Sequence, residues 1–226
     1  MAVNPIYGIT PFSLLDFKDY TSCIVWFSRC NMKCLYCYNP ELVFGKGVYD
    51  YQYVLDFLEK RKGLLDGVVL SGGECTIHSN FYQFVEAIKS RGFKVKIDTN
   101  GLRPLVIDRL IKNNLVDFIS LDFKTHPADF KNLTGSKNFF QFEKTLEILL
   151  ESKIAFEVRT TIHSELIRPK DFEKMIQFLR EKGYKQPYYL QPFRNGVTTI
   201  AELPLSVISD ELKQVVSADF DIIWRE

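Results

Sequence analysis

Three cysteines crowd into one short segment of the chain, Cys30-Asn-Met-Lys-Cys34-Leu-Tyr-Cys37. The C-x3-C-x2-C spacing puts three thiolates on one loop, and thiolates are the ligands that hold iron–sulfur clusters. A cubane [4Fe–4S] cluster normally takes four thiolates, so three leave one iron with open positions. An open metal position can bind a substrate or cofactor directly, as it does in catalytic zinc sites. The spacing therefore predicts a catalytic iron–sulfur site.

A structural zinc ion is the alternative interpretation of the same cysteines. Structural zinc takes four ligands, and the chain contains no second C-x2-C or H-x3-H pair to complete the set. Cys23, Cys75 or His78 would have to supply the fourth ligand. Cys23 lies within an apolar run, which favours a role as a small buried hydrophobic residue. The pattern favours the cluster.

Further polar residues lie where later apolar runs end. Ser71-Gly72-Gly73-Glu74 follows one run, and paired glycines let backbone groups approach a ligand closely. Other polar residues lie at or near the ends of the next four runs: Asp98-Thr99-Asn100, Asp122 with Lys124, Arg159, and Gln191. A lone aspartate there is more often a cap or turn residue. Because ligands of parallel α/β proteins bind at this strand end, we expect one shared site.

Six apolar runs alternate with amphipathic segments, which predicts a series of strand–helix units. Strands are expected at Ser22–Ser28, Gly67–Ser71, Phe93–Thr99, Asp117–Phe123, Ile154–Ile162 and Pro187–Gln191. Helices are expected at Tyr51–Lys62, Asn80–Arg91, Pro104–Asn113, Lys137–Ser152, Arg168–Lys182 and Ser209–Ser217. Six units are too few for a closed eight-unit barrel. The predicted fold class is α/β, as an open or partial barrel or a doubly wound sheet.

The composition argues against several classes of protein. A length of 226 residues suits a single α/β domain, expected over residues 1–226. The 29 basic and 28 acidic side chains give a net charge of +1, so there is no overall electrostatic case for nucleic acid. No apolar run is long enough to span a membrane, and the start, MAVNPIYGIT, lacks the pattern of a signal peptide. We expect a cytoplasmic protein that binds neither nucleic acid nor membrane.

With Tyr36 before the third cysteine, the cysteine segment resembles the signature of the radical S-adenosylmethionine (SAM) superfamily. The resemblance implies a partial (β/α)6 TIM-like barrel, a [4Fe–4S] cluster on the three cysteines, and SAM bound at the open iron. The Gly72-Gly73-Glu74 segment resembles the motif that holds the methionyl ammonium of SAM. Cys75 stands where that family usually has proline, and the resemblance leaves its role open.

Other segments resemble motifs of glycyl-radical-enzyme activases. In some of those enzymes, two aspartates and a threonine, matched here by Asp98, Thr99 and Asp122, help to hold a monovalent cation beside the SAM carboxylate. Asn100 belongs to the same motif, and Lys124 would add positive charge there. The resemblance further implies a SAM contact for Arg159, and a place near the adenosine of SAM for Gln191.

The widest resemblance, from Pro11 to Gly196, is to the anaerobic ribonucleoside-triphosphate reductase activating proteins. It rests on segments such as FSRCNMKCLYCYNPEL, VVLSGGE, KIDTNG, SLDFKT, VRTTIH and LQPFRNG. It implies reductive cleavage of SAM to a 5′-deoxyadenosyl radical, which forms a glycyl radical on the partner reductase. An electron donor such as flavodoxin or ferredoxin is implied. The alternatives are another glycyl-radical enzyme, a peptide or small-molecule substrate, or a non-catalytic metal-binding scaffold.

A partial barrel leaves one side open, unlike a closed barrel. We expect the glycine loop of the partner to enter between the Cys30–Asn39 loop and the Gln191–Gly196 loop. Arg194, at that mouth, is a candidate docking residue, although an exposed arginine is more often simply solvated.

Overall fold

The protein is described by a computed structural model covering residues 4–225, so residues 1–3 and 226 of the expected domain lie outside the described residues. Eight strands form one sheet in the order of the sequence. They are β1 (Ile6–Ser13), β2 (Ser22–Phe27), β3 (Gly67–Gly72), β4 (Lys94–Thr99), β5 (Phe118–Asp122), β6 (Ala155–Ile162), β7 (Tyr188–Pro192) and β8 (Ile222–Trp224). Strand β1 is antiparallel to β2, and every later pair is parallel.

The six predicted strands are β2 to β7, so the α/β fold with a partial barrel at its centre is confirmed. Within residues 4–225, no ladder joins β1 to β8, and the barrel is open between these two edges. No helix in this described range is long and apolar enough to cross a membrane.

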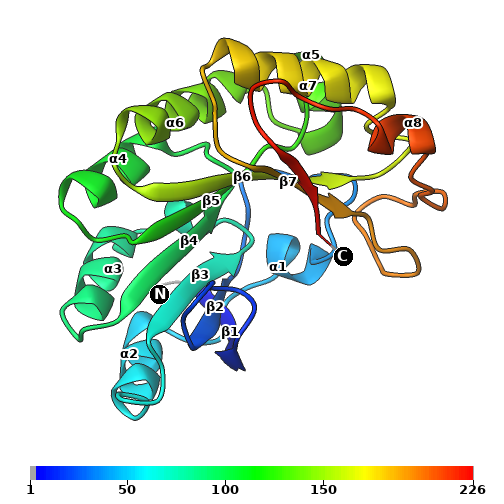
Figure 1. The fold of residues 1–226 in the computed structure, drawn as a ribbon. Coiled ribbons are helices and arrows are strands. Elements are labelled where there is room, and N and C mark those ends of the chain that lie inside the picture. Colours follow the sequence, from blue (N-terminus) through cyan, green and yellow to red (C-terminus); the bar gives the residue numbers. More distant parts are fainter. Residues whose placement is uncertain (1–3, 226) are drawn as a thin grey trace.

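Helices follow the strands and cover the outer face of the curved sheet, as Figure 1 shows for α2, α3, α4 and α6. The helices are α1 (Pro40–Phe44), α2 (Tyr51–Glu59), α3 (Phe81–Lys89), α4 (Pro104–Lys112), α5 (Pro127–Thr134), α6 (Phe139–Glu151), α7 (Pro169–Glu181) and α8 (Asp210–Lys213). A single 3-10 turn, Cys75–Ile77, follows β3. Proline at the first position of α4 and α7 suits a helix start, since its missing N–H has no partner there.

Helix α3 shows how the pattern in the sequence produces the packing. Its apolar residues Phe81, Phe84, Val85 and Ile88 recur at helical spacing, and all four are buried against the sheet. Burying each such side chain contributes about 1.5–3 kcal/mol, which outweighs the weak helix propensity of the aromatic residues. The helices thereby hold the strands in place. The carboxyl ends of the parallel strands meet at one rim of the barrel.

Five elements differ from the sequence-based expectation. Strand β1 was not expected, because Gly8 and Pro11 interrupt its pattern, although both residues are tolerated in an edge strand. Helices α1 and α5 were also not expected, and both are short. The last helix is a single turn, α8, rather than Ser209–Ser217. The apolar end of the chain, where no strand was expected, forms β8 against β7.

Candidate active site

A cavity of about 510 Å³ lies at the carboxyl ends of the parallel strands. Every site residue expected from the sequence lines it: Cys30, Cys34, Tyr36, Cys37, Gly72, Gly73, Glu74, Asp98, Thr99, Asn100, Asp122, Lys124, Arg159 and Gln191. The volume is within the usual range for small-molecule sites, about 300–1,000 Å³. A larger hollow of about 660 Å³ lies along α7, beside Val215 and Val216, and none of these residues lines it.

The cysteine loop follows β2 and is held against α5 by backbone hydrogen bonds. Arg29 begins it with a left-handed backbone (φ 65°). The N–H groups of Lys33 and Leu35 donate to the carbonyl oxygens of Thr134 and Leu133, at the end of α5. A helix that was not expected therefore supports the loop that carries the three cysteines.

The three cysteines of the loop are free thiols that face the same cavity. In the described part of the chain, no three Cys, His, Asp or Glu side chains converge as ligands of a single metal ion. A cubane cluster needs no such convergence, because each thiolate binds a different iron. A cavity lined by three separate thiols therefore fits a cluster.

The possible fourth zinc ligands are all occupied elsewhere. Cys23 is fully buried in the core. The Cys75 thiol is also fully buried, and it donates to the carbonyl oxygens of Leu70 and Asp98, both at 3.7 Å. His78 contacts the Ser28 carbonyl oxygen at 2.7 Å through Nε2. Cys75 therefore packs in the core and is not among the residues that line the cavity.

Burial raises the pKa of the Cys30 thiol to about 12 and that of Cys34 to about 11. The neighbouring Glu74 carboxylate adds to the effect at Cys30. Both thiols therefore carry protons at neutral pH until iron displaces them, and cluster assembly releases those protons.

Glu74 ties the end of β3 to the end of β4. Its carboxylate accepts hydrogen bonds from the Asn100 N–H (2.8 Å), the Thr99 hydroxyl (2.9 Å), and the N–H and hydroxyl of Thr76 (3.2 and 2.5 Å). The side chain is buried, and burial raises its pKa despite these donors. Four donors fix the carboxylate rigidly beside the cysteine loop.

Close contacts with the neighbouring backbone require glycine at positions 72 and 73. Gly72 has a left-handed φ of 121°, and a Cβ there would meet the Phe27 backbone. A Cβ on Gly73 would collide with the carbonyl oxygen of Arg29, the residue before Cys30. The sequence-based expectation was that these glycines make room for a ligand. The structure adds a different reason, because β3 approaches the backbone of the cysteine loop at this point.

A row of alternating charges crosses the ends of β4, β5 and β6. The Arg159 guanidinium lies 2.6 Å from Asp122 (Nε to Oδ1) and 3.2 Å from Asp98 (Nη2 to Oδ2). Lys124 pairs with Asp122 at 3.1 Å, and Lys96 with Asp98 at 3.4 Å. Burial alone would raise the pKa of Asp122, but Arg159 and Lys124 overcome it and hold the pKa at about 2.

This row does not fit the monovalent cation that the sequence resemblance implied. The two aspartates already share the guanidinium of Arg159. The Thr99 hydroxyl donates to Glu74 at 2.9 Å instead of facing both carboxylates. Asp98, Asp122 and Thr99 therefore do not form an open set of ligands for a monovalent cation.

Two buried polar atoms at the cavity have no hydrogen-bond partner among the described residues: Tyr36 Oη, and Asp98 Oδ1, which has only its ion-pair contact with Lys96 at 3.4 Å. Both atoms are shielded from water, and an unpaired buried polar atom costs about 1–3 kcal/mol. Burial raises the pKa of the Tyr36 phenol, so it stays protonated and can donate. These atoms, together with the three free thiols, fit a site completed by a cofactor.

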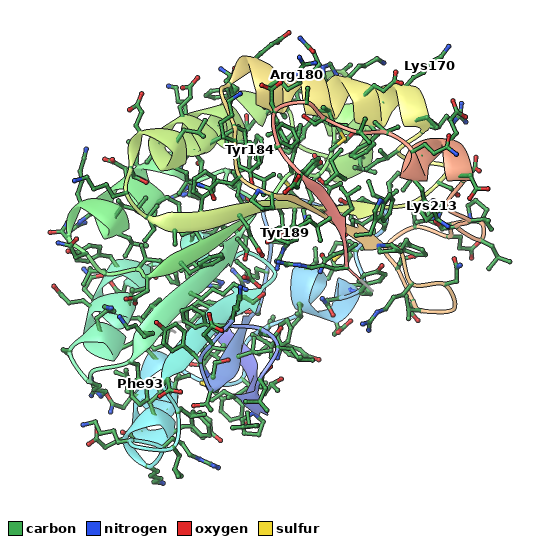
Figure 2. All side chains as sticks on the ribbon, in the orientation of Figure 1. Phe93, Lys170, Arg180, Tyr184, Tyr189 and Lys213 are labelled. Atoms are coloured by element: carbon green, nitrogen blue, oxygen red, sulfur yellow. The ribbon has the colours of Figure 1, made fainter. Side chains whose placement is uncertain are left out.

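Several residues of the site were not singled out from the sequence. Lys96 lies two residues before Asp98 on β4, so the strand period places both on one face, and this signal was available. Trp26 lines the cavity and donates from Nε1 to Thr10 on β1 at 2.9 Å. Arg225, after β8, also lines the cavity, and no local pattern marks it. Its guanidinium lies 3.6 Å from the centre of the Tyr189 ring, which is labelled in Figure 2.

The two loops expected to admit a partner are joined at the cavity rim. The Arg194 N–H donates to Tyr38 Oη at 2.7 Å, and the Ala201 N–H donates to the Leu35 carbonyl oxygen at 3.0 Å. The rings of Tyr38 and Phe193 pack with 5.3 Å between centroids. The cavity lies between these loops, but its rim at this point is bridged.

Two histidines outside the cavity have structural roles. His126 caps α5, where Nδ1 accepts the Ala128 N–H at 3.4 Å. His163 is fully buried. Its Nε2 lies 3.1 Å from the Pro204 carbonyl oxygen, and its ring packs on Phe193, so it holds the loop after β7.

The open barrel, the cysteine loop after its first parallel strand and the cavity at the strand ends define one class of enzyme. The model of the radical SAM superfamily matches residues 24–179, and the chain belongs to that superfamily. Its cofactors are therefore a [4Fe–4S] cluster and SAM.

Individual relatives refine this comparison. A candidate glycyl-radical enzyme activating enzyme of Methanocaldococcus jannaschii is 30% identical over 186 residues, covering 78% of this chain and 75% of that protein. The pyruvate formate-lyase-activating enzyme of Clostridium pasteurianum is 28% identical over 157 residues, covering 65% of each.

Solved structures agree on the fold. QueE from Escherichia coli superposes with a TM-score of 0.61 at 14% identity, over 99% of this chain and 94% of QueE. Streptococcus suis SuiB bound to SAM gives a TM-score of 0.65 at 15% identity, over 88% of this chain. The match spans less than half of SuiB, 48%.

Proposed function

We propose that this protein is a radical SAM activase that forms a glycyl radical on a partner enzyme. The observation that carries the proposal is the gathering of all the expected site residues around one cavity, in a chain similar to activating enzymes over most of its length. Reductive cleavage of SAM, when cluster and SAM are bound, supplies the radical that removes hydrogen from glycine.

The residues of the chain divide the work of holding these groups. Cys30, Cys34 and Cys37 hold the cluster in this proposal. Glu74 is fixed by its four donors, so its carboxyl group is already positioned for the SAM ammonium without rearrangement. Gln191, near the end of β7, lines the cavity and is proposed to contact the adenosine.

The charge row suits the carboxylate of SAM. Lys96, Lys124 and Arg159 carry three positive charges against two on Asp98 and Asp122, which leaves a surplus of one. The carboxylate of SAM, placed beside this row, would bring the net charge of the row and the carboxylate to zero. The aspartates hold the cations in fixed positions, so little reorganisation accompanies binding.

For the target, we propose anaerobic ribonucleoside-triphosphate reductase, with a flavodoxin or ferredoxin as electron donor. The support is the resemblance of segments between Pro11 and Gly196 to activating proteins of that reductase. Another glycyl-radical enzyme is the alternative that the Clostridium relative favours, because that relative activates pyruvate formate-lyase by name.

The test is anaerobic reconstitution of the full chain with iron and sulfide, then addition of reductant, SAM and reductase. A glycyl radical should appear by electron paramagnetic resonance, with 5′-deoxyadenosine released in step with it. The Cys37→Ala variant is the control and should give neither. A glycyl radical on pyruvate formate-lyase alone would identify that enzyme as the target. Turnover of a peptide or metabolite alone would contradict the activase role. Absence of SAM cleavage would indicate a non-catalytic scaffold.

A further inference from the structure

Arg159 lies between the two aspartates that end β4 and β5. Its Nε is 2.6 Å from Asp122 Oδ1, and its Nη2 is 3.2 Å from Asp98 Oδ2. The three side chains are largely buried, with exposed fractions of 16%, 22% and 13%. A buried arginine with two carboxylate partners is held in one geometry, because its planar guanidinium fixes the direction of each donor.

The oxygen atoms around this arginine are also engaged, and Asp98 Oδ1, which accepts no hydrogen bond, has the Lys96 ammonium at 3.4 Å. Asp122 Oδ2 accepts from Lys124 at 3.1 Å, and Asp98 Oδ2 accepts from the Ser71 hydroxyl at 3.1 Å. Thr99 Oγ1 donates to Glu74 and accepts the Gly101 N–H at 3.1 Å. An alkali-metal ion at this position would have to displace the guanidinium and break several of these hydrogen bonds.

The balance of charge gives a second, independent argument. Three cations and two anions leave the row with one surplus positive charge. The carboxylate of SAM neutralises that surplus. Within the row itself, a further monovalent cation would restore one uncompensated positive charge beside the Arg159 guanidinium.

We propose that the guanidinium of Arg159 occupies the position of a monovalent cation, so that this enzyme holds the SAM carboxylate without bound sodium or potassium. Arg159 acts as a positioning residue for Asp98 and Asp122. The inference requires SAM as cofactor, and it does not depend on which protein or molecule receives the radical.

The experiment measures thermal unfolding of the full chain, before and after cluster reconstitution, in chlorides of sodium, potassium and tetramethylammonium at one ionic strength. The wild-type Tm should be the same in all three salts. Without its guanidinium, Arg159→Ala leaves two facing carboxylates that an alkali ion can bridge. Its Tm should rise by about 3 °C or more in sodium or potassium relative to tetramethylammonium.

Arg180→Ala is the matched control. Arg180 lies on the outer helix α7 and pairs with Asp219 on the surface, away from the cavity (Figure 2). Its Tm should not depend on the identity of the cation. A purely structural role for Arg159 would lower the Tm of Arg159→Ala equally in every salt, and that result would overturn the proposal.

A second measurement keeps the test decisive if Arg159→Ala does not fold. SAM binding to the reconstituted wild type should have the same Kd in potassium and in tetramethylammonium. Thallium-205 resonance, with thallous ion as the probe, should show no site that potassium displaces. A potassium-dependent Kd or a displaceable thallous ion in the wild type would show that the cation site exists beside Arg159.

Discussion

The phenol oxygen of Tyr38 accepts a hydrogen bond from the backbone N–H of Arg194 at 2.7 Å. The contact joins the loop that carries the cysteines to the loop after β7. Replacing Tyr38 by Phe keeps the ring packed on Phe193 but removes the acceptor, at a cost of about 1 kcal/mol. We expect faster hydrogen exchange of the Arg194 amide in this variant.

The control for that measurement is Tyr82→Phe on α3, where the ring lies 3.9 Å from the Arg109 guanidinium. It should leave exchange at Arg194 unchanged. If Tyr38→Phe also leaves it unchanged, the two loops are held together by other contacts, such as the Ala201 N–H on the Leu35 carbonyl oxygen.

The second prediction concerns the cluster ligands. Reconstituted wild type should carry about four irons per chain. Alanine at Cys30, Cys34 or Cys37 should abolish cluster binding or SAM cleavage, measured by iron analysis and 5′-deoxyadenosine release. Cys23→Ala should keep both, because that thiol is buried in the core away from the cavity. Loss of iron in Cys23→Ala with retention in Cys37→Ala would reverse the assignment.

The third prediction separates two roles of Gly73. Its missing Cβ leaves space for the Arg29 carbonyl oxygen, next to the first cysteine. Gly73→Ala should therefore lower iron content together with SAM affinity. Gly8→Ala, where a Cβ meets nothing within 4 Å, is the matched control and should keep both. Full iron content with weakened SAM binding in Gly73→Ala would instead support a direct ligand role for this glycine.

The fourth prediction concerns acid. The pKa of Asp122 is about 2 when folded, against an ordinary value of 3.8. A carboxyl group whose pKa is lower in the folded state stabilises the fold at pH values above its ordinary pKa. That stabilisation is lost as the pH falls through the folded-state pKa. The contribution, about 2 kcal/mol, should therefore disappear between about pH 4 and pH 2. Asp122→Asn should unfold more easily at neutral pH, with a flatter slope across that window in urea titrations.

The parallel strands and the site residues could be predicted because their signals are local. Buried strands appear as apolar runs, and the polar residues that end them stand next to those runs, as Asp98 does after β4. Parallel topology then brings all such ends to one rim. This is why the cavity gathers every expected residue.

The remaining features depend on contacts distant in the sequence. Strand β1 is stabilised by pairing with β2, although Gly8 and Pro11 weaken its own pattern. Arg225 reaches the cavity because β8 pairs with β7 and Glu157 binds its guanidinium at 2.6 Å. The resemblance implied a cation between Asp98 and Asp122, but it did not show that Arg159 lies between them.

Strand order identical to chain order has a consequence for the timing of assembly. During synthesis, each new strand can pair with one that has already left the ribosome, so the sheet can grow from its amino-terminal side. The cysteine loop emerges early, whereas Arg225 lines the same cavity from the last described strand end. Until β8 has formed, the cysteine loop faces water and the side of the cavity that Arg225 lines is missing. Iron loading is thus a step for the finished chain, and nascent chains stalled before β7 should not retain a cluster.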